Sequence, residues 1–295
     1  MKTIGFDLGS AYTKAVLLSE DNRPALSYYG RQSPDDLKAV TDFLDLVETR
    51  FPQETFKWGV TGGRTDAGGF EDAPEEINGI LAVAAGITSM GLKPRWIIEI
   101  GGHSAKSILM NPDVPNTIRE FAIHDACAAG SGSFFESQAE RLRLSVGDLA
   151  ARSASAAREA VIAGRCAVFA KSDMIHLQQK GTPIDEIALG VCMAICRNVI
   201  ATLLKGRDLE PPVVIAGGCA QNGGIIRAFR NILGSSDPTL LMPSSHPGLE
   251  GAIGAAVKAG SSEAASRTIP ELKRLIGRRI TAGASTPDFL PSLRR

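Results

Sequence analysis

Two cysteines, Cys127 and Cys166, are the residues of this sequence best suited to chemistry, because each lies at or near an expected helix start. Around Cys127 the run 124–135 is rich in alanine, glycine and serine, and a helix is expected from Phe135. Backbone N–H groups at that helix start are expected to point toward the sulfur and to favour its negative charge. The thiolate is the form of cysteine that ligates a metal or attacks an electrophile. From the residues alone, these thiols are metal ligands, a catalytic nucleophile or buried packing groups.

Two strand–turn–strand segments, 4–18 and 96–110, carry an acid, a glycine and a lysine in the same register. The equivalent residues are Asp7 and Glu99, Gly9 and Gly101, and Lys14 and Lys106. This match favours an internal duplication, with one hairpin in each half of a two-domain nucleotide-binding fold. Glycine turns let backbone N–H groups approach phosphate oxygens, and the acid can order a water bound to Mg²⁺. Two unrelated hairpins with glycine turns are the alternative.

A third pattern joins a strand, two glycines and a helix. The apolar run 212–216 is typical of a buried parallel strand. It ends at Gly217 and Gly218, and Gln221 and Asn222 precede the next helix. Such a unit can cradle the phosphate or adenosine part of a nucleotide, although the pattern alone is a weak signal.

Apolar periodicity and turn residues predict the elements that position these groups. Further strands are expected at 57–60 and 118–123. Helices are expected at 33–51, 75–85, 135–149, 154–162, 166–177, 183–203 and 223–233, and a helix of small residues at 248–256. Cys192 and Cys196 lie four apart on the apolar face of one helix, where a thiol packs as a small hydrophobic group, and Cys219 is interpreted in the same way.

The composition is that of a soluble globular protein long enough for two domains. Of 295 residues, 44% are hydrophobic and 22% are charged. Lys plus Arg and Asp plus Glu both number 32, so no positive excess indicates nucleic acid or an anionic membrane as a partner. No apolar run reaches the ~18 residues of a membrane span and no secretion signal is evident, so the cytoplasm is the expected location. Five cysteines without even pairing argue against a disulfide framework.

The order of these motifs resembles the superfamily of actin, heat-shock chaperone ATPases and sugar kinases. The cysteine motifs narrow it: residues 125–132, 166–170 and 217–222 are similar to the ATP-dependent activators of 2-hydroxyacyl-CoA dehydratases and the ATP-binding subunits of benzoyl-CoA reductases. The resemblance to this BadF/BadG/BcrA/BcrD type of ATPase runs from Ile4 to about Ala259. It implies an α/β protein of actin-like (ribonuclease H-like) ATPase fold, with two duplicated domains flanking a nucleotide cleft.

The resemblance also implies cofactors and partners. ATP or ADP would bind with Mg²⁺, and one [4Fe-4S] cluster would be shared by two subunits through Cys127 and Cys166 of each. A homodimer, or a heterodimer with a related subunit, would accept electrons from ferredoxin or flavodoxin and pass them to an acyl-CoA dehydratase or reductase component. The residues agree with this assignment, because a cubane cluster needs four thiolates and this chain contains no CxxC pair. Two cysteines per chain complete the set across a two-fold axis.

The same resemblance assigns roles to individual residues. Asp7, Glu99 and Ser104 are expected to be catalytic, and Cys127 and Cys166 to be the metal ligands. The expected nucleotide-binding residues are Gly9, Ser10, Lys14, Gly101, Gly102, Gly130, Gly132, Gly217, Gly218, Gln221, Asn222 and Glu250.

The expected first domain combines residues 1–116 with 246–260, and the second, 117–245, carries the cluster cysteines. Residues 261–295 are expected to form a basic C-terminal extension, which is either a solvated segment or a docking segment.

Two departures from the family keep other functions open. The family's second hairpin usually has aspartate at Glu99 and Gln-Asp at His103 and Ser104. Glu99 can still order a Mg²⁺-bound water, but the missing carboxylate at Ser104 indicates slower hydrolysis.

A small-molecule kinase of the same fold, for a sugar or for pantothenate, would use Asp125 as its base and would need no iron. A nucleotide-gated sensor with damaged hydrolysis is the third alternative.

Overall fold

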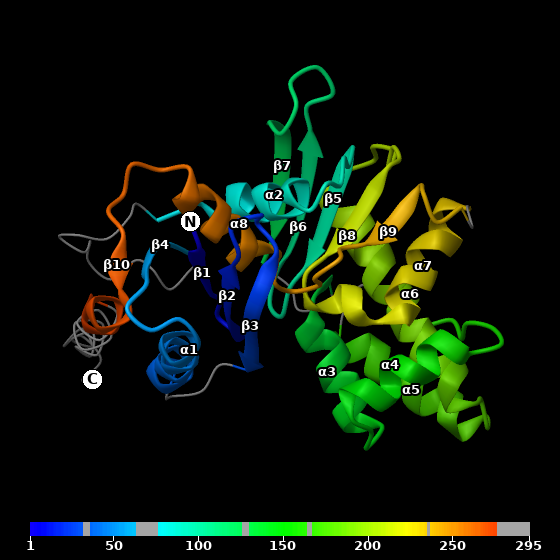
Figure 1. Ribbon diagram of the computed structural model, residues 1–295. Helices are drawn as coiled ribbons and strands as arrows, with labels where there is room; N and C mark the ends of the chain where they lie inside the picture. Colours follow the sequence, from blue (N-terminus) through cyan, green and yellow to red (C-terminus); the bar gives the residue numbers. More distant parts are fainter. Residues whose placement is uncertain (32–35, 63–75, 126–129, 164–166, 235–236, 276–295) are drawn as a thin grey trace, which may run out of the picture. The chain divides into compact units, whose positions relative to one another are not determined.

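The computed structural model describes residues 1–31, 36–62, 76–125, 130–163, 167–234 and 237–275. Contacts within the chain divide it into two compact units (Figure 1). Unit 1 comprises residues 1–79 and 255–295, and unit 2 comprises residues 80–254. Each unit is built around its own five-stranded sheet.

The sheet of unit 1 has the strand order β10-β4-β1-β2-β3. Its strands are β1 (Thr3–Leu8), β2 (Tyr12–Leu18), β3 (Pro24–Arg31), β4 (Thr55–Thr61) and β10 (Arg267–Thr268). β1 is antiparallel to β2 and parallel to β4, so the first hairpin and the strand after it share one sheet. The crossover to the parallel strand β4 runs through helix α1 (Asp36–Arg50), as a parallel connection requires.

The core of unit 1 lies between this sheet and α1. Ile4 and Phe6 of β1 both belong to this core, because every second side chain of a strand lies on the same face. The Phe6 ring meets Phe43 of α1 and Trp58 of β4 edge-on, each with ring centroids 6.4 Å apart. Burial of these aromatic rings fixes the strand that carries Asp7.

The start of the C-terminal segment is packed onto unit 1. β10 pairs antiparallel with β4, and the helical residues 269–275 follow it. Ile269 and Leu272 are buried in the unit 1 core, and the Lys273 ammonium lies 2.5 Å from Asp45 and 2.6 Å from Glu48 of α1. Residues 267–275 are therefore packed on unit 1 and are not a solvated segment. A docking role for the extension stays a prediction, and residues 276–295 lie outside the described part of the chain.

The sheet of unit 2 has the order β7-β6-β5-β8-β9. Its strands are β5 (Trp96–Ile100), β6 (Ala105–Met110), β7 (Ile118–His124), β8 (Val213–Ala216) and β9 (Leu241–Pro243). The helices are α2 (Gly79–Ser89), α3 (Gly132–Arg141), α4 (Val146–Ser155), α5 (Ala167–Gln179), α6 (Ile184–Leu203), the short η2 (Gly218–Gln221) and α7 (Gly223–Leu233), with α8 (Glu250–Gly260) passing from unit 2 into unit 1.

Both faces of the unit 2 sheet are covered. Ile97 and Val214 face α2 on one side, whereas Ile98 and Ile215 face a larger core that includes α3, α4, α6 and α7. Figure 1 shows α6 and α7 beside β8 and β9. α6 is the one helix among the described residues that is long and apolar enough to cross a membrane, but 67% of its most apolar window is buried in the protein. It is therefore the core helix of unit 2.

Two expected helices differ from the structure: 135–149 is divided into α3 and α4 by the non-helical residues 142–145, and 154–162 is wrong. α4 ends at Ser155, and residues 156–163 run without helical structure against α6. The Ala160 N–H donates to the Glu186 carbonyl at 3.0 Å, and a Cβ atom at Gly190 would lie 2.3 Å from the Ala160 carbonyl oxygen. Close backbone packing on Gly190 therefore replaces the local helix that the apolar spacing indicated.

Four strands of each sheet repeat one topology, whereas the fifth differs, because β10 is antiparallel to β4 and β9 is parallel to β8. β5 is antiparallel to β6 and parallel to β8, as β1 is to β2 and β4. Because β5 and β6 share a sheet with β8, the second hairpin belongs to unit 2. The units therefore divide the chain near residue 79, whereas the sequence-based division placed the boundary at residue 116.

Candidate nucleotide-binding site

The first hairpin, β1 and β2 with their turn, places an acid beside a lysine. Asp7 and Lys14 are partners in the strand register, and the Lys14 ammonium lies 3.0 Å from the Asp7 carboxylate. The Gly9 N–H donates to the Tyr12 carbonyl at 3.1 Å and closes the turn, with Ser10 exposed at its tip. A Cβ atom at Gly9 would lie 3.0 Å from that carbonyl oxygen, so glycine keeps the turn narrow.

The second hairpin, β5 and β6 with their turn, has the same geometry. The Lys106 ammonium lies 2.5 Å from the Glu99 carboxylate, and the two residues are partners in the register. The Gly101 N–H donates to the Ser104 carbonyl at 2.9 Å, as Gly9 does to Tyr12. The duplication inferred from the sequence thus extends to the ion pair and to the hydrogen bond that closes the turn.

A third repeated feature was not recognised from the sequence. The strands parallel to β1 and β5 both end in a glycine with positive φ, Gly62 at 114° and Gly217 at 80°. A Cβ atom at Gly62 would lie 2.5 Å from the Leu8 carbonyl oxygen, and one at Gly217 would lie 2.4 Å from that of Ile100. Leu8 and Ile100 directly follow the two acids. The sequence contains a signal for this repeat, since a pair of glycines follows each of the two strands, Gly62-Gly63 after β4 and Gly217-Gly218 after β8.

Glu250, at the start of α8, is turned inward. Its Oε1 accepts the Gly217 N–H at 3.2 Å and its Oε2 accepts the Gly248 N–H at 2.8 Å. Burial raises the pKa of Glu250 to about 7, although hydrogen bonds from the backbone and from Ser244 act in the opposite direction. The side chain is 2% exposed. Within unit 2 the buried Glu250 carboxylate therefore holds the β8 turn, Gly217 and Gly218, through the Gly217 N–H.

Two further residues expected to bind nucleotide have structural partners. The Asn222 side chain caps α7 by accepting the Gly224 N–H at 2.8 Å and the Ser153 hydroxyl at 3.1 Å. Gln221 donates to the Pro247 carbonyl at 3.1 Å. Asn222 is buried, so its amide faces the core of unit 2, and contact with adenosine stays a prediction for both residues.

The comparisons decide the family. The model of the BadF/BadG/BcrA/BcrD ATPase family matches residues 4–259. This chain is 31% identical over 262 residues to the activator of lactoyl-CoA dehydratase of Anaerotignum propionicum, covering 88% of this chain and 97% of that protein. This chain belongs to the BadF/BadG/BcrA/BcrD ATPase family.

Solved structures agree with the family and with its fold. The activator of the 2-hydroxyisocaproyl-CoA dehydratase from Clostridium difficile with bound ADPNP superposes with a TM-score of 0.76 at 26% identity, over 98% of this chain and 100% of that one. Component A of the (R)-2-hydroxyglutaryl-CoA dehydratase of Acidaminococcus fermentans gives 0.74 at 26% identity, over 88% and 99%. The expected actin-like ATPase fold is confirmed.

In this BadF/BadG/BcrA/BcrD ATPase the two predicted metal ligands, Cys127 and Cys166, lie outside the described residues. Within the described ranges, no group of three or more His, Cys, Asp and Glu residues is placed to hold a metal ion. Cluster ligation by these two thiols therefore stays a prediction.

The first N–H groups of α3 have partners that the sequence did not indicate. They were expected to point toward the Cys127 sulfur, but Gly132 donates to the Gly101 carbonyl and Ser133 to the Gly102 carbonyl, both at 2.8 Å. In this ATPase the start of α3 is thus bonded to the turn of the second hairpin. Gly132 allows the approach, because a Cβ atom there would lie 3.2 Å from the Gly101 carbonyl oxygen.

The other three thiols pack in the core of unit 2. Cys192 and Cys196 are buried, and Cys219 packs against the same core. Burial raises the pKa of the Cys192 and Cys219 thiols to about 12 and that of Cys196 well above its ordinary value. These cysteines are therefore protonated at neutral pH, which suits packing and not metal ligation.

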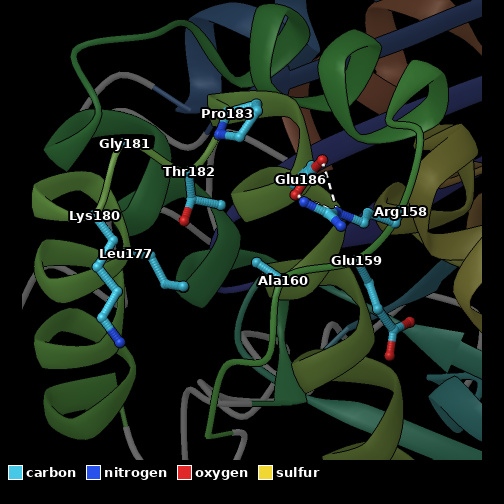
Figure 2. Close-up of a pocket in the computed structure, with 9 residues that line it drawn as sticks. All are labelled: Arg158, Glu159, Ala160, Leu177, Lys180, Gly181, Thr182, Pro183 and Glu186. Atoms are coloured by element: carbon cyan, nitrogen blue, oxygen red, sulfur yellow. Dashed lines mark hydrogen bonds and ion pairs between the residues drawn. The ribbon is translucent and has the colours of Figure 1, made fainter.

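A separate hollow of about 430 Å³ lies beside the α5–α6 turn (Figure 2). Arg158 donates to both carboxylate oxygens of Glu186 at 3.1 Å, and Lys180 and Thr182 come from the turn. None of the residues predicted for the nucleotide site lines this hollow.

Proposed function

We propose that this protein is an ATP-dependent activator of a partner acyl-CoA dehydratase or reductase. It couples hydrolysis of ATP to the transfer of one electron at low potential. The observation that carries the proposal is the 31% identity to the activator of lactoyl-CoA dehydratase, because the match covers 97% of that activator. The family match, residues 4–259, includes both hairpins, so the likeness is not limited to one nucleotide-binding domain.

The hairpins are suited to a ligand that brings both phosphate and Mg²⁺. Each presents a carboxylate and an ammonium on adjacent strands, Asp7 with Lys14 and Glu99 with Lys106. In the proposed complex the lysines turn to phosphate oxygens and the acids orient water bound to Mg²⁺. Gly9, Ser10, Gly101, Gly102 and Ser104 form the turns around the phosphates, and the β8 turn lies toward the adenosine.

The proposed electron carrier is a [4Fe-4S] cluster bound by Cys127 and Cys166 of each of two subunits, which supplies a one-electron couple when bound. Exposed apolar side chains on either side of Cys166 in the sequence support a subunit contact there. Val161 is 80% exposed, and Phe169, in the first turn of α5, is 64% exposed. Large exposed apolar groups are typical of interaction surfaces.

In the proposed cycle ferredoxin or flavodoxin is oxidised by one electron, and the partner dehydratase or reductase is reduced by one. ATP is converted to ADP and phosphate in the same cycle. The bonds from Gly101 and Gly102 to the start of α3 support the coupling, because they join the second hairpin to the helix that follows Cys127.

The test is ATP hydrolysis by the anaerobically purified protein, reduced with dithionite and supplied with a low-potential electron acceptor. The expected result is oxidation of the protein by the acceptor that depends on ATP and releases phosphate. Transfer of the γ-phosphate to a sugar or to pantothenate would instead support the kinase alternative. Nucleotide binding without any turnover would support the sensor.

A further inference from the structure

Glu250 joins two loops that are 31 residues apart, the β8 turn and the segment before α8. Each carboxylate oxygen accepts one backbone N–H, from Gly217 at 3.2 Å and from Gly248 at 2.8 Å. Both glycines have positive φ, 80° and 89°. A backbone held in this region lacks the regular hydrogen bonds of a helix or strand, so the carboxylate supplies partners that neither loop provides.

The β8 turn is fixed from its other side as well. Gly217 lies so close to Ile100 that a Cβ atom would come within 2.4 Å of its carbonyl oxygen. Ile100 directly follows Glu99 of the second hairpin. The hydrogen bond to Glu250 and the close approach to Ile100 therefore hold the turn against β5, the strand that carries the proposed catalytic acid Glu99.

We propose that Glu250 is a positioning residue of the nucleotide site, which holds the Gly217–Gly218 turn in its binding geometry without touching the nucleotide. The inference rests on the proposed role of the β8 turn in binding adenosine. It differs from the direct contact expected from the sequence, because Glu250 is 2% exposed and both of its carboxylate oxygens already accept backbone N–H groups.

The ionised form of Glu250 is the form that holds both loops. A carboxylate accepts hydrogen bonds on both oxygens, whereas in the protonated acid one oxygen carries a hydrogen and is a much weaker acceptor for a backbone N–H. Burial raises the pKa of Glu250 to about 7, and the Glu99 charge, itself paired with Lys106, acts in the same direction. Ser244 donates to the carboxylate, α2 contributes the uncharged Gly86, and His246 lies in the same loop.

The test is the dissociation constant of MgADP for the full-length protein, measured by calorimetry at pH 6 and pH 8. Glu250→Gln, which keeps the shape but replaces one acceptor by an amide donor, is expected to weaken binding about tenfold at pH 8. The ratio of variant to wild-type constants is expected to fall toward one at pH 6, where wild-type Glu250 is protonated. Ionisation of ADP itself cancels in this ratio. The KM for ATP rises by the same factor, with kcat within about twofold.

Glu186→Gln is the matched control, since it removes another largely buried carboxylate of unit 2 that lies away from the β8 turn. It is expected to leave MgADP affinity unchanged, and His246→Gln is expected to keep the wild-type pH profile. Equal affinity of Glu250→Gln and wild type at pH 8 overturns the inference and leaves the electron-transfer proposal intact. A ratio that does not vary with pH also overturns it. If Glu250→Gln fails to fold, Ser244→Ala decides: weaker binding supports the positioning role, and unchanged binding contradicts it.

Discussion

At Glu250, the burial that holds the β8 turn also lowers the stability of unit 2. A carboxyl group with an ordinary pKa of 4.5 has a pKa of about 7 in the folded protein. The folded state therefore binds the proton more tightly than the unfolded state does. Its contribution to stability is full below pH 4.5 and is lost as the pH rises through 7. Ionisation of Glu250 completes the hydrogen bonds to Gly217 and Gly248, and it also lowers the free energy of unfolding of unit 2.

Glu250→Gln is expected to remove this pH dependence. Between pH 5 and pH 8 the free energy of unfolding of the wild type should fall by about 2.5 kcal/mol more than that of the variant. Urea unfolding followed by Trp96 fluorescence in a Trp58→Phe background reports unit 2, because the protein has two tryptophans and Trp58 lies in unit 1. Parallel pH profiles for the two proteins would contradict the raised pKa.

The sequence predicted the acids of the two hairpins because register and spacing are local properties of a strand. Asp7 meets Lys14, and Glu99 meets Lys106, across one turn each. The direction of the Glu250 side chain is not local, since it depends on loops 217 and 248 meeting in space. The partners of Asn222 are not local either. Its glycine-rich surroundings can be read in the sequence and favoured a nucleotide contact, but its hydrogen bonds to Ser153 and Gly224 cannot.

At the scale of the elements, the glycine that ends the parallel strand fixes how closely β8 approaches the second hairpin. Gly217 has φ 80° and ψ 175°, a region that is essentially restricted to glycine. It also has no space for a side chain beside Ile100. Gly91 has the same φ of 80° but nothing within 4 Å of an added Cβ atom, so it is a control for a positive φ without close packing.

Gly91→Ala is expected to destabilise unit 2 by about 1 kcal/mol, from the left-handed backbone alone. Gly217→Ala should cost at least about 3 kcal/mol more or prevent folding, because the Ile100 backbone cannot move without disturbing β5. Thermal and urea unfolding of the two variants measure the difference. Equal stabilities would mean that the close approach of Gly217 to Ile100 is relaxed in solution.

The segment after α8 provides a second element-scale prediction. Leu272 is fully buried in the unit 1 core. Leu272→Ala is therefore expected to lower the free energy of unfolding by about 2–5 kcal/mol, as is usual for a buried leucine. Arg274 is exposed and is the control, with a change expected within about 0.5 kcal/mol. Unfolding followed by Trp58 fluorescence in a Trp96→Phe background reports unit 1. A neutral Leu272→Ala would show that the segment is not docked.

The wrong helix at 154–162 illustrates that periodicity does not predict a segment whose conformation depends on distant contacts. Apolar spacing alone indicated a helix, but Ala160 bonds to Glu186 of α6 and packs on Gly190, which lie 26 and 30 positions further along the chain. The hairpins, the apolar helix α6 and the strand β8 were predictable because their patterns are contained in the segments themselves. Docking of residues 267–272 on β4 depends on a partner at residues 55–56, which periodicity does not reveal.

At the scale of the whole molecule, the duplication explains why one chain carries two similar hairpins and only one set of special cysteines. Both units repeat the same sheet order, and each repeats the acid, the lysine and the glycine that ends the parallel strand. Unit 2 alone adds the helices α3 to α6 between its third and fourth strands in sequence, β7 and β8. Cys127 and Cys166 fall in that insertion, so the family's duplicated fold and its proposed electron-transfer function are carried by different parts of the chain.

The most direct test of the account is the iron and acid-labile sulfide content of the protein purified without oxygen. We expect a coloured dimer with about two irons and two sulfides per subunit, that is, one shared cluster per dimer. Cys127→Ser and Cys166→Ser should each abolish the visible absorbance and weaken the dimer, whereas Cys192→Ala should leave both intact. An iron-free, colourless wild-type protein, or equal loss in all three variants, would contradict the central claim.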